Sequence, residues 1–154
     1  MSETKSTGPS VEFTITRTFE ASRERVFRAW TDPARFSQWF GPKGFTTPQE
    51  TISLDTTPGA AWSARMVSPE GQEATIAGFY REAVEPERLV FTTGDPDNDK
   101  GDLASVVTVT FTDLGGRTEM RFHQAGYNTS EEHAKGAEAG WVQFFDRLAD
   151  HLTT

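Results

Sequence analysis

Residues 129–152 read TSEEHAKGAEAGWVQFFDRLADHL and predict a long C-terminal helix. Thr129 and Glu132 have the spacing of a capping box, in which each side chain satisfies a backbone amide at the start of a helix. Large apolar residues then recur at helical spacing, and burying each contributes about 1.5–3 kcal/mol, so the helix is expected to pack against a sheet. They are Trp141, Phe144, Phe145, Leu148 and Leu152.

The chain begins with one predicted strand and two short predicted helices. Residues 11–19 alternate apolar and polar side chains, which is typical of a half-buried strand. Ser22 is placed to cap a first helix, and Asp32 followed by Pro33 starts a second one. Phe36, Trp39 and Phe40 form the apolar stripe of the second helix. The Gly-Pro pair at 41–42 is expected to end this helix, because proline lacks the amide hydrogen that a further turn would use.

The middle of the chain predicts a meander of strands. Short turn signals at 58–59, 69–71, 85–87 and 114–116 separate most of them, and such short connections make antiparallel neighbours. With the first strand, this gives an α+β fold with an antiparallel sheet of about seven strands. The predicted strands are residues 46–55, 61–68, 74–84, 88–94, 104–112 and 117–124.

Composition narrows the function classes. The 154 residues fit a single domain, expected over residues 11–153 after a disordered tail at 1–10. A net charge of -8 argues against nucleic acid as a partner, and no apolar run has membrane-spanning length. The absence of cysteine excludes disulfides and thiolate sites, which suits a reducing compartment, so we expect a cytoplasmic location.

Several local strings, in this order, resemble a known family. They are RTF at 17–19, VFRAWTDP at 26–33, QWFGP at 38–42, Asp55 with the Pro58-Gly59 turn, the Gly78-x-Tyr80-x-Glu82 pattern, and the segment from 140 to 148. Together they are similar to the activator of heat-shock protein 90 ATPase homologue-like domains of the SRPBCC superfamily, which includes START and birch-pollen-allergen-like domains. The resemblance spans residues 11–153. It departs at Thr57 and Ala60, where such domains carry Arg and a second Gly, and at Phe145, where Leu is common.

This resemblance implies a helix-grip fold, in which a curved antiparallel sheet wraps around the long helix. Members of the superfamily commonly enclose a cavity for apolar ligands between sheet and helix, whereas the eponymous co-chaperone domain binds a chaperone. A closed aromatic core is the alternative to a cavity. Strand periodicity and the helical stripes give the candidate ligand-binding residues. They are Trp39, Phe40, Trp62, Met66, Ile76, Tyr80, Phe91, Val107, Val109, Met120, Phe122, Trp141 and Phe145.

Two charged residues, Arg17 and Glu82, fall in phase with the apolar faces of their strands. A charge buried without a partner is costly, so we expect them to pair with each other, to meet a polar group such as Asp55, or to face water in a cavity. Both are also candidate ligand-binding residues, because they could orient a polar group of the ligand.

Two glycines fall in the first half of the long helix. Gly136 and Gly140 each weaken a helix by up to about 1 kcal/mol relative to alanine. Close packing against a neighbour would explain them. Alternatively, they leave volume beside the cavity and allow the first turns of the helix to move.

The sequence offers no catalytic or metal signature. The three histidines lack metal-ligand spacing, and the Asp-rich segment at 95–99 lacks the Gly and Glu of a calcium loop. We therefore predict no cofactor, no metal and no catalytic residue, and a non-catalytic binding protein for a small apolar molecule. The alternatives are a co-chaperone-like module that stimulates a chaperone ATPase, and a pocket enzyme using Tyr80, Glu82 or His123. A homodimer through edge strands stays open.

Overall fold

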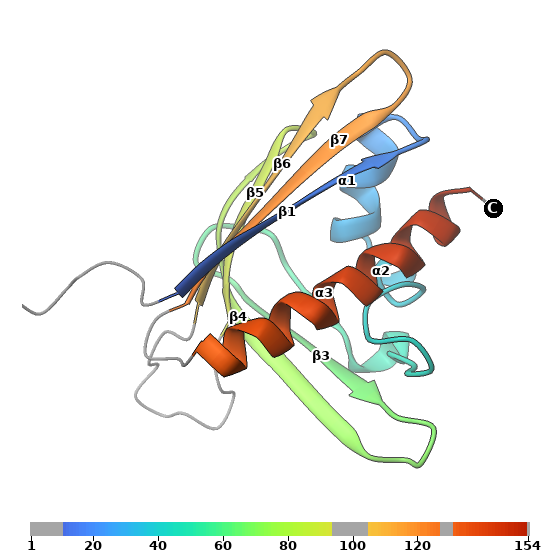
Figure 1. Ribbon diagram of the computed structural model, residues 1–154, viewed down its shortest axis with the longest axis vertical. Helices are drawn as coiled ribbons and strands as arrows, with labels where there is room; N and C mark the ends of the chain where they lie inside the picture. The colour runs from blue at the N-terminus through green and yellow to red at the C-terminus, as the bar shows by residue number, and fades with distance from the viewer. Residues whose placement is uncertain (1–10, 94–104, 127–130, 154) are drawn as a thin grey trace, which may run out of the picture.

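A computed structural model describes residues 11–93, 105–126 and 131–153, and Figure 1 shows their arrangement. The helices are α1 (Arg23–Thr31), α2 (Pro33–Phe36), the single-turn η1 (Gln49–Thr51) and α3 (Glu131–Leu152). The strands are β1 (Val11–Phe19), β2 (Ser53–Leu54), β3 (Ala61–Val67), β4 (Glu73–Val84), β5 (Arg88–Thr93), β6 (Ser105–Asp113) and β7 (Thr118–Gly126).

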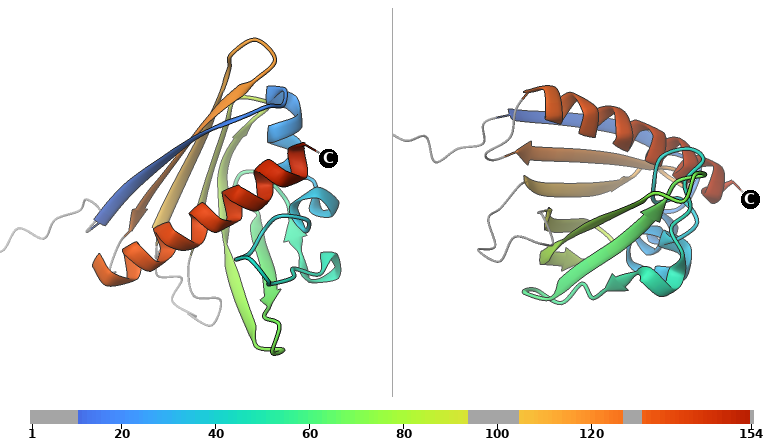
Figure 2. Two further views of the ribbon diagram at one scale, coloured as in Figure 1. Left: turned by 45° about the vertical axis from the view of Figure 1, so that its right-hand side comes forward. Right: turned by 90° about the horizontal axis from the view of Figure 1, so that it is seen from below.

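The strands form one seven-stranded sheet in the order β1-β7-β6-β5-β4-β3-β2, and every neighbouring pair is antiparallel. Figure 2 shows the sheet curving around α3, with α1 and α2 near the C-terminal end of that helix. The predicted α+β helix-grip architecture is confirmed. Among the described residues, no helix is long and apolar enough to cross a membrane.

The beginning of the chain folds as its local signals predict. β1 covers the predicted strand, Ser22 caps α1 by accepting from the Arg25 amide, and Asp32 caps α2 by accepting from the Ala34 amide. The second helix is shorter than predicted, because α2 ends at Phe36 and the apolar residues that follow lie in turns. The indole of Trp39 holds this segment against α1 by donating to the Ala29 carbonyl at 2.9 Å.

The predicted strand at 46–55 is mostly wrong. Only Ser53–Leu54 is a strand there, with a single bridge between Thr46 and Val67 and the helical turn η1 between them. Pro48 has no amide hydrogen to pair, and the hydroxyl of Thr51 donates to the Pro48 carbonyl at 2.7 Å. This local hydrogen bond competes with strand pairing. The other predicted strands are confirmed within one or two residues, apart from their ends at 94 and 104, which lie outside the described residues.

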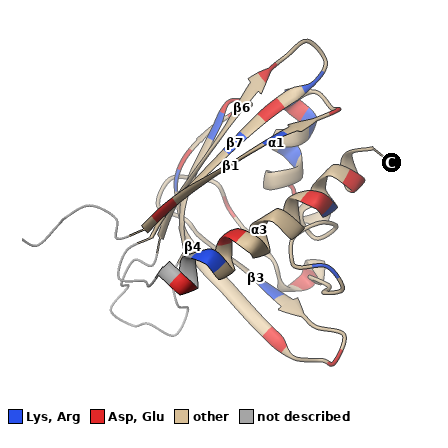
Figure 3. Ribbon diagram, in the orientation of Figure 1, with Lys and Arg blue, Asp and Glu red and all other residues tan. Residues whose placement is uncertain are grey.

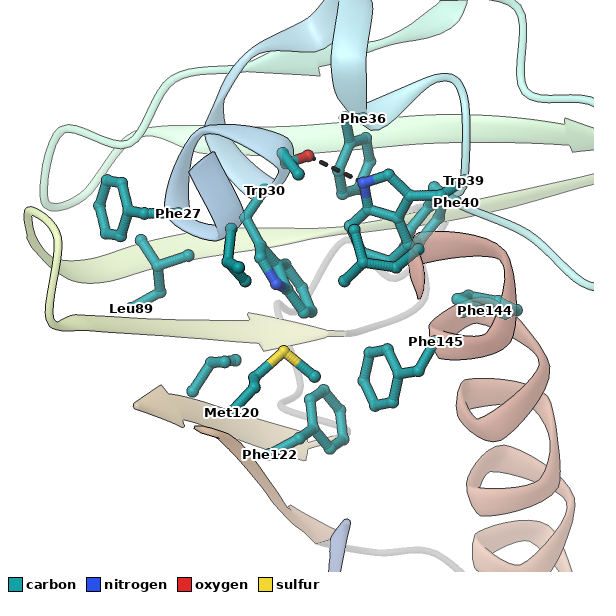
Figure 4. Close-up of a cluster of buried hydrophobic side chains, with 14 of the residues drawn as sticks. Phe27, Trp30, Phe36, Trp39, Phe40, Leu89, Met120, Phe122, Phe144 and Phe145 are labelled. Carbon is teal, nitrogen blue, oxygen red and sulfur yellow. Dashed lines mark hydrogen bonds between the residues drawn. The ribbon is translucent and has the colours of Figure 1, made fainter. Parts of the chain in front are cut away.

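Figure 4 shows the aromatic cluster between the helices and the sheet. Trp30 of α1 lies among rings from three directions, with its ring centroid 4.9 Å from Trp39, 6.0 Å from Trp141 and 6.4 Å from Phe122. These side chains are almost wholly buried. We call this packed region the aromatic core; it joins α1, the turn after α2, the second half of α3 and the inner face of the sheet.

Candidate functional site

The two halves of α3 bury very different side chains. From Trp141 to the end of the helix, five large residues are buried against the sheet: Trp141, Phe144, Phe145, Leu148 and Leu152. Between Lys135 and Gly140, none of the described side chains is buried, although Ala137 packs partly against the core. Figure 3 shows charged residues along both halves, so charge does not distinguish them. The first half therefore contributes little to the core.

The two glycines of α3 are not explained by close packing. Among the described residues, a Cβ added at Gly136 would meet nothing within 4 Å, and one at Gly140 would meet only the Phe144 ring at 4.0 Å. By helical spacing, Gln143 and Arg147 lie on the same edge of α3 as the glycines. That edge is fastened to the loop after α2, since the amide of Lys43 donates to Gln143 at 3.1 Å. Gln143 lies about one turn after Gly140, so this contact does not reach the glycines.

Arg147 secures the same edge. Its Nη1 donates to the carbonyls of Gly41 at 3.0 Å and Pro42 at 3.1 Å, and burial lowers the pKa of its guanidinium from the ordinary value. Gly41 adopts a φ of 121°, a conformation that L side chains rarely adopt. Arg147 thus links the loop after α2 to the second half of α3.

The predicted inner-face residues do line the interior, but they fill it. Trp39, Phe40, Val107, Val109, Met120, Phe122 and Phe145 have no exposed surface, and Trp62, Tyr80, Phe91 and Trp141 are nearly as buried; Met66 and Ile76 are partly buried. A crevice between Trp30, Phe40, Trp62, Tyr80 and Phe91 is too narrow for a water molecule. The closed-core alternative therefore describes this part of the interior, and the expected cavity is not formed there.

Arg17 and Glu82 do not meet each other, and neither contacts Asp55. Arg17 Nη1 lies 3.0 Å from Asp146 Oδ1, so this inner-face arginine ties β1 to α3, and its side chain is 28% exposed. Asp55 instead accepts from the Thr57 amide at 2.9 Å, which together with the Thr57 hydroxyl lowers the pKa of its carboxyl.

The predicted inward orientation of Glu82 is wrong. A bulge between Tyr80 and Glu82 shifts the register, so that Tyr80 lies opposite Phe91 but Glu82 lies opposite Val90. Paired residues share a face, and Val90 lies outside the core cluster, so Glu82 points outward, 3.5 Å from Arg88. Ala83 packs against the core in its place.

Asp146, near the middle of α3, forms ion pairs with Arg17 and Lys43. Burial alone would raise its pKa, but hydrogen bonds from Arg17 and Lys43, together with their positive charges, outweigh it and hold the pKa below the ordinary value. The Lys43 ammonium lies 3.4 Å from the second carboxylate oxygen. The carboxylate thus links β1, α3 and the loop after α2.

The residues considered for catalysis do not come together. Tyr80 is buried in the interior, and desolvation raises the pKa of its phenol well above the ordinary value. His123 lies on the outer face, where its Nε2 is 2.9 Å from Glu12, and Glu82 also faces outward. Among the described residues, no cluster of three potential metal ligands occurs. The capping box and the Asp-rich segment include residues outside the described ranges.

The sequence analysis missed a row of polar residues on the inner face. Thr93, Ser105 and Gln124 come from the adjacent strands β5, β6 and β7 and are all buried. Gln124 Nε2 donates to Ser105 Oγ at 2.7 Å, and the hydroxyls of Ser105 and Thr93 share a short hydrogen bond. We call these three residues the polar end. Their phase was a usable signal, because Gln124 continues the inward series of Met120 and Phe122.

The polar end lies level with the first half of α3. Arg17, opposite Met120 on β7, reaches Asp146, and two residues further along β7 the ring of Phe122 lies 4.6 Å from Trp141. Two strand residues span about 6.6 Å and five helix residues about 7.5 Å. A step of two residues along β7 therefore corresponds to a step of about five residues back along α3. The next such step along β7 is Gln124, which brings it level with Gly136 and Ala137.

A sheet that curves around one long helix, with a packed aromatic core at one end and a buried polar row at the other, defines a helix-grip domain. The family described as Activator of Hsp90 ATPase homolog 1-like protein matches residues 20–153. The chain belongs to this family, as its sequence motifs predict.

Solved structures agree with this assignment. The AHSA1 protein from Silicibacter pomeroyi is similar at a TM-score of 0.80 and 26% identity, covering 93% of this chain and 98% of its own. A protein from Chromobacterium violaceum gives 0.77 at 26% identity, covering 93% and 97%. An AHSA1-like protein from Aeromonas hydrophila, at 20% identity, a TM-score of 0.76 and coverage of 93% and 92%, shares the fold. A search of curated proteins finds no match.

Proposed function

We propose that this protein binds a small, largely apolar molecule between the inner face of the sheet and the first half of α3. One observation carries the proposal: Gly136, Ala137 and Gly140 place minimal side chains level with a buried inner-face surface that includes Gln124. From Trp141 to Leu152, large side chains fill the corresponding positions. Binding sites combine apolar walls with a few placed polar atoms, and this region has both.

In this proposal, some of the predicted ligand-binding residues contact the ligand and others support those residues from behind. Phe122 and Trp141 lie at the boundary between the aromatic core and the polar end, so they would form the apolar wall beside the ligand. Trp39, Phe40 and Phe145 would act from behind that wall by holding it in place. Glu82 has no place in the proposed site because it faces outward.

The proposal is tested by the fluorescence of N-phenyl-1-naphthylamine, a neutral apolar dye, in Ala137→Trp and Ala139→Trp. Ala137 faces the core from the first half of α3, whereas Ala139 is exposed two residues away. We expect the wild type and Ala139→Trp to bind the dye, and Ala137→Trp to lose binding while remaining folded, because its indole occupies the ligand's space.

Two outcomes would contradict the proposal. Absence of dye binding to the wild type would exclude an apolar site. Loss of stability by about 1–3 kcal/mol in Ala137→Trp would show that the space beside residue 137 is already filled.

A second candidate function is a co-chaperone-like interaction. The family description favours it, and Phe79 of β4 offers an exposed aromatic side chain, 54% accessible, as a contact. Addition of the protein to a chaperone of the heat-shock protein 90 class would then raise its ATPase rate, and Phe79→Ser would reduce the increase. An unchanged ATPase rate would leave ligand binding as the function.

A further inference from the structure

The polar end contains a buried acceptor without a donor. Gln124 is 8% exposed, its Nε2 is used by Ser105, and its Oε1 is buried with no hydrogen-bond partner. Most buried polar atoms in folded proteins have a partner, and leaving one unpaired costs about 1–3 kcal/mol. Replacing this glutamine with an apolar residue would avoid that cost, so the amide at this position suits a partner from outside the chain.

The surroundings of this acceptor are neutral. On the inner faces of β5, β6 and β7, the described residues beside Gln124 carry no charged side chain; Asp113, the inward-phase residue at the far end of β6, is exposed. The nearest inner-face charge on β1 is Arg17, four residues from Phe13, which lies opposite Gln124; this is about 13 Å along the strand. Arg17 is already engaged by Asp146. A carboxylate placed beside Gln124 would therefore meet an acceptor and no cation on the inner face of the sheet, and Lys135, the cation on the first half of α3, is exposed to solvent.

From this arrangement we propose that Gln124 Oε1 accepts a hydrogen bond from the ligand, and that the ligand is a neutral apolar molecule with one terminal hydroxyl or N–H group. The inference rests on the proposed function and adds the chemical class and orientation of the ligand. Its polar group lies at Gln124, and its apolar body lies along Phe122 and Trp141. Ser105 and Thr93 hold the glutamine amide, so its carbonyl is fixed before the ligand arrives.

Three ligands of nearly equal size separate donor, acceptor and charge. 2-Naphthol carries a hydroxyl donor, 2-methoxynaphthalene only an ether acceptor, and 2-naphthoate an anionic group. Each is titrated against bound N-phenyl-1-naphthylamine at pH 7. We expect 2-naphthol to displace the dye at about one fifth of the concentration that 2-methoxynaphthalene requires, in line with one net hydrogen bond. 2-Naphthoate should be the weakest competitor.

Gln124→Met provides the matched variant, because methionine has nearly the same length and no polar acceptor of comparable strength. We expect it to bind 2-methoxynaphthalene as the wild type does, with the preference for 2-naphthol lost. Gln49→Met, on the exposed surface of η1, should keep the preference. Circular dichroism verifies that each variant is folded, and the wild-type preference tests the proposal without any variant.

The outcomes distinguish this inference from the proposed function. If the dye binds but 2-naphthol and 2-methoxynaphthalene compete equally, or Gln124→Met keeps the preference, the polar contact is wrong and apolar binding still holds. If 2-naphthoate competes best, the ligand class is wrong. If the wild type binds no dye, both proposals fail together.

Discussion

From Trp141 to Leu152, α3 presents large apolar side chains to the sheet and is fastened through Asp146 and Arg147, whereas from Lys135 to Gly140 it presents glycine and alanine. Both parts belong to one continuous helix. One half therefore stabilises the fold, and the other, with its small side chains, is where we propose that the ligand binds. The comparison teaches that packing against the sheet is concentrated in one segment of α3; if the ligand binds at the other segment, substitutions should affect stability and binding separately.

The largest expected effect is on the packed half. Phe145→Ala should lower the free energy of unfolding by about 3–5 kcal/mol, because the ring is wholly buried among other aromatic rings. Lys135→Ala, on the exposed first half, should change it by less than about 0.5 kcal/mol. Urea denaturation followed by tryptophan fluorescence measures both. Equal losses in the two variants would remove the distinction between the halves.

The next effect concerns the fastening of α3 to the loop after α2. Arg147→Met should lower the free energy of unfolding by about 1–3 kcal/mol, since the carbonyls of Gly41 and Pro42 lose their donor. Arg121→Met, on the exposed side of β7, is the control and should be nearly neutral. If the two variants were equally stable, the loop contact would contribute nothing to the fold.

A smaller effect of opposite sign is expected in the first half. Gly140→Ala should raise the free energy of unfolding by up to about 1 kcal/mol, because alanine favours helix and the new Cβ meets only a ring at 4.0 Å. Gly78→Ala is the contrast: its Cβ would clash with the Thr92 carbonyl oxygen, so the substitution should destabilise the protein strongly. Thermal unfolding ranks the variants, and a lower melting temperature for Gly140→Ala would mean that the glycine is needed for packing.

The smallest effect is the pH dependence of the Asp146 contacts. Because the folded-state pKa of Asp146 is lowered, its contribution is present above the unfolded pKa, near 3.9, and is lost as the pH falls through the folded value. Asp146→Asn should lower stability by less than about 1 kcal/mol at pH 7, since the pair is partly exposed. As the pH falls from 7 to 3, the melting temperature of the wild type should approach that of Asp146→Asn. A difference that stays constant over this range would show that the Asp146 carboxylate does not cause the pH dependence.

Local signals in the sequence were sufficient for much of the fold. The caps at Ser22 and Asp32 and the alternation along β1 are confirmed, because each depends on side chains within a few residues. The bulge after Tyr80 was not predictable, since an extra residue leaves the alternation of the sequence unchanged while reversing the orientation of Glu82. Because of this bulge, Glu82, one of the two charged residues expected in the interior, faces outward.

The candidate site was predictable only in part. Periodicity assigned the inner-face residues correctly, but it could not show that rings from α1 and α3 fill the space between them, because packing depends on how distant elements meet. Gln124 lay in phase with Phe122, yet a polar residue at a strand end commonly faces solvent. Only the tertiary structure shows that it is buried with its carbonyl unpaired.

The most direct test of ligand binding at the first half of α3 is amide hydrogen exchange, measured with and without N-phenyl-1-naphthylamine. In the free protein, amides between Lys135 and Gly140 should exchange faster than those from Trp141 onward, because they adjoin few buried contacts. The dye should slow exchange in the first half and leave the second half nearly unchanged. Uniform protection along α3 in the free protein, or a dye effect confined to residues 141–152, would contradict the account.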